Sequence, residues 1–256
     1  MTQDERLDKL ICYLLREKAE YKTIPIPDSA ADKRRLLRSL MNVRPPAPVS
    51  EDFLKVQDEY LQGVLAEKQV IRTADLTPVQ PGLYLWRGDI TTLAADAIVN
   101  AANSAMLGCF VPCHGCIDNA IHSAAGVQLR LECARIMAQQ QAEEPTGRAK
   151  ITRAYNLPCR YVLHTVGPII DGRVTRQDRE LLASCYRSCL ELAAAQSLES
   201  VAFCCISTGE FRFPHQEAAA IAVRTVKAFL QTPTSIRKVI FNVFKDIDAD
   251  LYRSLL

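Results

Sequence analysis

The sequence predicts a three-layer α/β domain with a mixed or largely parallel sheet, preceded by a helical N-terminal extension. Two observations support this prediction. Residues 1–75 hold three amphipathic patterns of helical period, whereas beyond residue 80 short apolar runs alternate with longer helical patterns. Such alternation is typical of a sheet that is covered by helices on both faces. We therefore expect residues 1–79 to form the extension and residues 80–256 to form the main domain.

The extension is expected to contain three helices. Apolar residues recur at helical spacing in residues 7–15, 36–41 and 53–65. The proline-rich segment RPPAPVS separates the second pattern from the third, since prolines end helices. Lysines and arginines gather in residues 33–38, a run that we interpret as a solvated helix face.

The main domain is expected to alternate strands with helices. The strand segments are LYLWRGDI, AIVNAAN, YVLHTVG, VAFCCIS and KVIFNVF, and helical patterns occupy residues 128–141, 179–196 and 216–231. In sheets of this class, ligands bind at the carboxyl ends of the strands, on the loops that follow. The loops after AIVNAAN and VAFCCIS are therefore the expected places for chemistry.

The composition argues against several classes of protein. The net charge is +2 and aromatic residues make up only 7% of the chain, so we expect no nucleic-acid partner. No apolar stretch approaches the ~20 residues that span a bilayer, and the charged N-terminus does not resemble a signal peptide. The ten cysteines are then best interpreted as reduced thiols. These features predict a cytoplasmic protein with no membrane partner.

Soft metal ligands are concentrated in the segment GCFVPCHGC, at Cys109, Cys113, His114 and Cys116. A closed structural zinc site usually takes its ligands as two separated pairs. Here four candidates fall within eight residues. Because Cys113 and His114 are adjacent, three ligands meeting at one metal is easier to build than four. Three protein ligands with an open position is the pattern of catalytic zinc, which we therefore favour over a closed site.

Two other interpretations of this segment are weaker. PCHGC fits half of the zinc deaminase signature, but that signature needs an upstream H-x-E, and His114 is the first histidine of the chain. Cys113 and Cys116 also form a C-x-x-C, as in redox pairs. The thioredoxin-like version normally has no intervening histidine and no further cysteine nearby, so we disfavour it without excluding it.

Four blocks of sequence resemble the macrodomain family of ADP-ribose-binding modules. They are RGDITTLAADAIVNAANSAMLG, IDNAIHSAAG, HTVGP and CISTGEFRFP, and their order and spacing match the family over about residues 80–256. Macrodomains usually have a glycine-rich stretch where this chain has GCFVPCHGC. That difference and the helical extension resemble the zinc-containing macrodomain subclass, whose members are hydrolases that remove ADP-ribose from proteins. The resemblance implies an α/β/α macrodomain with a mixed central sheet.

The resemblance also implies roles for single residues. It implies that Cys109, His114 and Cys116 bind Zn²⁺, with Cys113 a spare or a substitute ligand. It implies catalytic roles for Asp118 and for Asn103, which also binds the distal ribose. Asp118 could act as a general base or hold the nucleophile in line. From the residues alone, Asp118 could instead cap the helix that begins near residue 117.

Further residues are implied to bind ADP-ribose. Asp89 and the backbone of Ile90 are expected to recognise adenine, and Phe244 to stack on it. Asn103 is expected to bind the distal ribose, and Asn100 is included among the substrate-binding residues, although at its strand end it could instead hold the loop. Asp89 could otherwise cap a turn, and Phe244 could pack in the core. The diphosphate and distal ribose are expected on the turn formed by Ser207, Thr208, Gly209, Glu210 and Phe211, where backbone N–H groups suit an anion.

The sequence thus predicts a zinc-dependent hydrolase that removes mono-ADP-ribose from modified protein side chains, with aspartate or glutamate linkages favoured. ADP-ribose is expected in a cleft at the carboxyl ends of the strands. Some members of the subclass act opposite a sirtuin-type transferase that modifies a lipoyl-carrier protein. The alternatives are a non-catalytic ADP-ribose reader with a structural zinc loop, and a scaffold whose partner docks on the extension.

Overall fold

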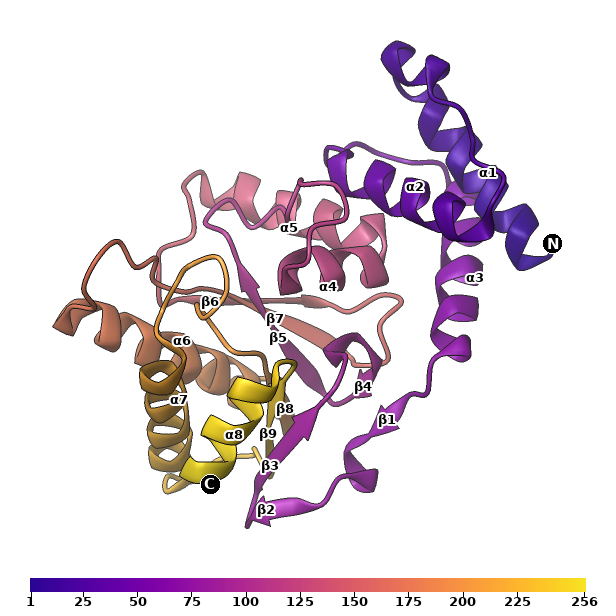
Figure 1. The fold of residues 1–256 in the computed structure, drawn as a ribbon. Coiled ribbons are helices and arrows are strands. Elements are labelled where there is room, and N and C mark those ends of the chain that lie inside the picture. Colours follow the sequence, from indigo (N-terminus) through magenta and orange to yellow (C-terminus); the bar gives the residue numbers. More distant parts are fainter.

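A seven-stranded mixed sheet forms the centre of the structure, a computed structural model that describes residues 1–256 (Figure 1). The strand order is β2-β3-β9-β8-β5-β7-β6. The inner neighbours are parallel, and the outer pairs β2/β3 and β6/β7 are antiparallel. The strands are β2 (Pro78–Gln80), β3 (Leu83–Arg87), β5 (Ala97–Ala102), β6 (Ala149–Arg153), β7 (Tyr161–Val166), β8 (Ser200–Phe203) and β9 (Lys238–Val243).

Helices cover both faces of this sheet, which explains why its inner strands are largely apolar and almost entirely buried. On one face lie α4 (Ile117–Ala125) and α5 (Val127–Gln140) (Figure 1). The other face carries α6 (Arg176–Ala195), α7 (His215–Leu230) and α8 (Asp246–Leu255). The predicted three-layer α/β/α architecture with a mixed sheet is confirmed. None of the helices is long and apolar enough to cross a membrane.

The N-terminal region forms the three predicted helices, α1 (Gln3–Arg16), α2 (Ala30–Val43) and α3 (Glu51–Glu67). A side-chain hydroxyl caps the start of each helix, from Thr2, Ser29 and Ser50 respectively. Their apolar faces pack together in a core of their own, which is joined by Val127 from α5. Helix α2 also contacts α4 of the main domain.

The connection between the helical region and the sheet contains further short elements. Strand β1 (Ile71–Arg72) pairs in parallel with β4 (Leu93–Ala94), and the 3₁₀ helices are η1 (Ala19–Thr23), η2 (Thr73–Asp75) and η3 (Ile90–Thr92). Strand β1 and the first two residues of β2 precede residue 80, and both strands pair with later strands. The chain on the two sides of the predicted boundary therefore shares backbone hydrogen bonds. A domain boundary at residue 80 stays a prediction.

Asp96 links the amino ends of the neighbouring strands β8, β5 and β7 through hydrogen bonds. Its Oδ2 accepts hydrogen bonds of 3.0 Å from the N–H groups of Glu199 and Ser200 and from the Ser200 hydroxyl, and its carbonyl accepts from Arg160 and Tyr161. Burial raises the pKa of this carboxyl, but the hydrogen bonds outweigh burial and hold the pKa below its usual value.

Asp96→Asn is therefore expected to lower the free energy of unfolding at pH 7 by about 1.5–3 kcal/mol, the usual contribution of hydrogen bonds to a charged group. A carboxyl with a depressed folded pKa stabilises above its unfolded pKa of about 4. That stability is lost as the pH falls through the folded pKa. Urea unfolding of wild type and Asp96→Asn should thus give a difference in the free energy of unfolding that is smaller at pH 3 than at pH 7. A difference that does not change with pH would contradict this role.

Candidate active site

Four of the predicted site residues follow four neighbouring parallel strands. Asp89, Asn103, Ser207 and Phe244 come soon after the ends of β3, β5, β8 and β9, which are consecutive in the sheet. Carboxyl ends of parallel strands meet at one edge, so the fold gathers these residues although they are far apart in sequence (Figure 1). A cleft for ADP-ribose at this edge stays a prediction.

The turn after β8 presents several unused backbone donors. The N–H groups of Ser207, Gly209, Glu210 and Phe211 donate to no protein atom, whereas Thr208 donates both its N–H and its hydroxyl to the Cys205 carbonyl. The turn is nevertheless fixed, because Phe213 N–H donates to the Ser207 carbonyl at 2.9 Å. A fixed turn with free N–H groups is an arrangement that binds anions.

Gly167, on the loop that follows β7, makes room for this turn. Ser207 has a left-handed φ of 66°, and its hydroxyl oxygen is buried without a hydrogen-bond partner. A Cβ atom at Gly167 would lie 2.0 Å from that oxygen. The block HTVGP therefore contributes a close backbone approach rather than a side chain.

Asp89 is fixed by contacts within the protein. Its Oδ1 accepts from Thr91 N–H at 3.0 Å and from the Thr91 hydroxyl at 2.6 Å, and its Oδ2 accepts from Lys68 Nζ at 3.0 Å. Burial raises the pKa of Asp89, but these hydrogen bonds outweigh burial and lower it. The capping alternative is confirmed, because Asp89 is the N-cap of η3. Recognition of adenine by Asp89 and by the backbone of Ile90 stays a prediction.

Phe244 lies on the surface beyond β9. Its side chain is 75% exposed, so the alternative that placed it in the core is wrong. An exposed ring at this edge of the sheet is free to stack on a planar base. Stacking on adenine stays a prediction.

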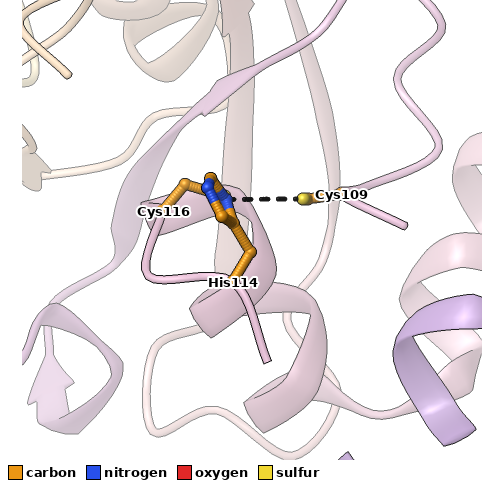
Figure 2. A group of neighbouring side chains, drawn as sticks. All are labelled: Cys109, His114 and Cys116. Carbon is orange, nitrogen blue, oxygen red and sulfur yellow. Dashed lines mark hydrogen bonds between the residues drawn. The ribbon is translucent and has the colours of Figure 1, made fainter. Parts of the chain in front are cut away.

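The three predicted metal ligands come together on the loop before α4. The donor atoms of Cys109, His114 and Cys116 all lie within 4.8 Å of one another. Cys109 Sγ lies 3.7 Å from His114 Nδ1, the contact drawn as a dashed line in Figure 2. Cys116 Sγ is the N-cap of α4, where it accepts from Asn119 N–H at 3.4 Å. We call residues 109–116 the metal loop.

This donor set fits zinc. A tetrahedral zinc with Zn–S near ~2.3 Å and Zn–N near ~2.0 Å places its ligand atoms about 3.5–3.8 Å apart, close to the Cys109–His114 distance. Burial raises the pKa of the Cys116 thiol to about 12, and the neighbouring Cys109 reinforces this. A cation among these donors would offset that cost by favouring the thiolate.

Cys113 lies apart from the other three candidates. Its Sγ lies 3.2 Å from the Ser39 hydroxyl and 3.4 Å from the carbonyl of Arg35, both on α2. Its own φ is 52°, a left-handed value. The group of close donor atoms does not include Cys113, which agrees with three candidate ligands meeting at one place and not four.

Asp118 lies just beyond the metal loop, in the first turn of α4. It is only 4% exposed, and its two oxygens accept from Asn100 Nδ2 at 2.8 Å and from Asn103 Nδ2 at 3.4 Å. The alternative that it caps α4 is wrong, because Cys116 is the N-cap. Burial raises the pKa of Asp118 to about 6, although the Asn100 hydrogen bond opposes this. The catalytic roles of Asp118 and Asn103 stay predictions.

Buried histidines surround this carboxylate. His164 Nδ1 lies 3.2 Å from Asn100 Nδ2 and its Nε2 lies 2.9 Å from the Thr152 hydroxyl, so both ring nitrogens have polar partners within the protein. Burial lowers the pKa of His164 to about 3, so the ring is neutral. Asn100 is fully buried and its amide serves Asp118 and His164, while substrate contact by Asn100 stays a prediction.

His122 lies in the core with His164 and Cys133, and the donor atoms of the three fall within 4.8 Å of one another. Burial, followed by the neighbouring His164, lowers the pKa of His122 well below its usual value. Its Nε2 lies 3.5 Å from Asp118 Oδ1, so His122 lies directly beside the Asp118 carboxylate.

The metal loop and the turn after β8 meet across the site. Glu210 Oε1 lies 3.6 Å from His114 Nε2, while the opposite ring nitrogen of His114 faces Cys109. Metal-binding histidines commonly present their second nitrogen to a carboxylate. Glu210 therefore joins the predicted anion-binding turn to the predicted metal ligands.

Comparison with known proteins assigns the family. Residues 99–222 match the family described as Macro domain. A protein-ADP-ribose hydrolase of Treponema medium is 57% identical over the full length of both chains. A protein-ADP-ribose hydrolase of Staphylococcus aureus (strain MRSA252) is 52% identical over 97% of this chain and 94% of its own.

Solved structures agree with this match. The Trypanosoma brucei macrodomain in complex with ADP-ribose superposes with a TM-score of 0.66 at 31% identity, covering 89% of this chain and 96% of its own. Both the fold and the long sequence matches lead to one assignment. The chain belongs to the macrodomain family, together with relatives named protein-ADP-ribose hydrolases.

Proposed function

We propose that this enzyme removes mono-ADP-ribose from aspartate or glutamate side chains of proteins, with zinc held by Cys109, His114 and Cys116. The observation that supports this most strongly is the convergence of three soft donors, a buried carboxylate and a turn of free N–H groups at one edge of the sheet. The full-length relatives named protein-ADP-ribose hydrolases support the reaction class. The aspartate or glutamate linkage rests on the earlier resemblance alone.

The chain's own residues bind and orient ADP-ribose in this proposal. The free N–H groups of the turn at residues 207–211 receive the diphosphate, and the exposed ring of Phe244 stacks on adenine. Asp89 and the backbone of Ile90 recognise the adenine edge. Asn103 orients the distal ribose next to Asp118, since its amide already lies within 3.4 Å of that carboxylate.

Hydrolysis adds water across the bond between ADP-ribose and the protein carboxyl group, giving free ADP-ribose and an unmodified acid. Asp118 holds the attacking water in line and accepts its proton, a role that suits a carboxylate fixed by two amides. A zinc ion on the metal loop supplies Lewis acidity toward a substrate oxygen. Buried His164 and Asn100 keep Asp118 in place.

Gly209→Val tests the anion-binding turn. Apart from its two chain neighbours, no residue has an atom within 4 Å of a Cβ atom at Gly209, so the larger side chain is expected to disturb mainly a ligand bound to the nearby N–H groups. We expect ADP-ribose affinity to fall at least about 10-fold, the equivalent of losing one charge-assisted hydrogen bond, with an unchanged melting temperature. Calorimetric titration measures the affinity. If the folded variant binds ADP-ribose with wild-type affinity, the diphosphate does not bind at this turn.

The proposal includes a cytoplasmic location and, by resemblance only, a lipoyl-carrier protein as target. All ten cysteines are free thiols, the state that a reducing compartment maintains. The target protein rests on the resemblance to the zinc-containing subclass and on no contact in this structure.

A further inference from the structure

Helix α2 of the N-terminal region makes hydrogen bonds to the metal loop and to the start of α4. The half-buried Arg38 donates from Nε and Nη2 to Asn119 Oδ1, at 3.1 and 2.7 Å, and from Nη2 to the His114 carbonyl at 3.0 Å. The guanidinium group thus bonds both to the backbone of His114, a predicted ligand, and to Asn119 on α4, the helix that follows the loop. The interpretation of residues 33–38 as a purely solvated face is wrong for Arg38.

A second contact from α2 holds the middle of the loop. The Cys113 N–H donates to Asn42 Oδ1 at 2.9 Å, and Asn42 is 1% exposed. Together with the Cys113 thiol beside Ser39, this contact fixes the left-handed turn at Cys113. Because His114 follows directly, the direction of its ring depends on that turn.

Asn119 contacts α2 and also two points of the metal loop, at Val111 and Cys116. It is fully buried, its Oδ1 accepts from Arg38, and its Nδ2 donates to the Val111 carbonyl at 2.9 Å. Its backbone N–H donates to Cys116 Sγ. One residue therefore connects the α2 arginine to the first half of the loop through its side chain and to a predicted metal ligand through its backbone N–H.

The position of α2 is itself set by the main domain. Arg130 of α5 donates from Nη1 to the carbonyls of Met41 and Asn42, at 3.0 and 2.8 Å, and so satisfies the last carbonyls of the helix. Its Nε donates to the carbonyl of Leu107 at 2.7 Å, two residues before Cys109. Arg130 is 5% exposed, so these bonds are shielded from solvent.

We propose that α2 is the positioning element of the metal loop, acting through Arg38 and Asn42. The N-terminal region contributes no metal ligand, yet its contacts decide where His114 and Cys116 place their donor atoms. This inference rests on the proposed function in one respect, namely that the metal loop holds zinc. Cys113 then serves as an anchor to α2, which explains why one of the three cysteines of the loop is not among the proposed ligands.

The test compares Arg38→Ala with Arg34→Ala, one turn earlier on the same helix. Arg34 is an exposed residue whose only ion pair is a 3.8 Å contact with Glu67, so its loss controls for charge and helix content. We expect Arg38→Ala to weaken zinc binding about 10- to 100-fold, as measured by competition with a colorimetric chelator. ADP-ribose affinity should stay within about threefold of wild type, because the turn at residues 207–211 is untouched.

Hydrogen exchange of the metal-free protein gives a second readout. The Cys113 amide should exchange faster in Arg38→Ala and remain protected in Arg34→Ala. Unchanged zinc affinity and unchanged exchange in Arg38→Ala would overturn the inference. If wild type binds no zinc, the proposed function loses its metal, and hydrogen exchange alone then decides whether α2 positions the loop.

Arg38→Lys covers the case in which the alanine variant does not fold. A lysine keeps the charge and the aliphatic stem but cannot span Asn119 and the His114 carbonyl with one planar fork. We expect this variant to melt near the wild-type temperature and to bind zinc more weakly. Full zinc affinity in Arg38→Lys would show that charge alone, and not the forked contact, acts on the loop.

Discussion

Cys116→Ser is expected to reduce release of ADP-ribose by more than about 100-fold while leaving ADP-ribose affinity nearly unchanged. Loss of a direct ligand should exceed the 10- to 100-fold effect of losing an outer partner. Serine is a good N-cap, so the start of α4 should survive the change. The variant separates the ligand role of Cys116 from its capping role. Metal content and turnover of the purified protein measure the effect.

Cys113→Ser is the matched control for this change. It replaces a thiol of the same loop whose neighbours are Ser39 and the Arg35 carbonyl, contacts that a hydroxyl can keep. Zinc content and turnover should stay close to wild type. Equal losses in both variants would mean that the metal loop tolerates no change of sulfur, and the assignment of Cys116 as a specific ligand would fail.

Asp118→Asn is expected to lower turnover about 10²- to 10⁴-fold, the usual contribution of a general base. Asparagine has the same shape and still offers an oxygen to Asn100 Nδ2, whereas the longer bond from Asn103 Nδ2 is lost because an amide nitrogen does not accept. Removing a buried charge should leave the melting temperature unchanged or slightly raised. Single-turnover kinetics at pH 7 give the rate, and titration with ADP-ribose gives the affinity.

The pattern of the effect distinguishes two roles for Asp118. A lower rate with wild-type ADP-ribose affinity and zinc content is expected of a residue that acts on water. A lower affinity with an unchanged rate would assign Asp118 to substrate binding instead. Loss of zinc in Asp118→Asn would mean that the carboxylate supports the metal loop, which ends two residues earlier at Cys116.

The fold was largely predictable because its inner strands and long helices carry strong periodic patterns. Runs such as KVIFNVF are mostly apolar and correspond to β9, in which every residue after Lys238 is buried. Strand β6, AKITR, escaped prediction because it is an edge strand of five residues with only two apolar side chains. Helix α8 buries only Asp248, Ala249 and Tyr252, too few apolar positions to stand out in sequence.

The site was predictable where single segments carry its chemistry. The metal loop and the turn at residues 207–211 are each contiguous, so spacing and family resemblance both apply to them. Contacts between distant segments could not be predicted in this way. Lys68 meets Asp89, and Arg38 meets His114, only because the N-terminal helices pack beside the sheet. Nothing in the local pattern of residues 33–38 distinguishes Arg38 from its exposed neighbours.

The most direct test of zinc-dependent hydrolysis uses a protein that carries one ADP-ribose on an aspartate or glutamate. Free ADP-ribose is measured after addition of the metal-stripped enzyme, and again after one equivalent of zinc is restored. We expect little release without metal and full turnover with it, while ADP-ribose binds in both states. Equal release in both states would contradict a role for zinc, and binding without release in either state would contradict hydrolysis of this linkage.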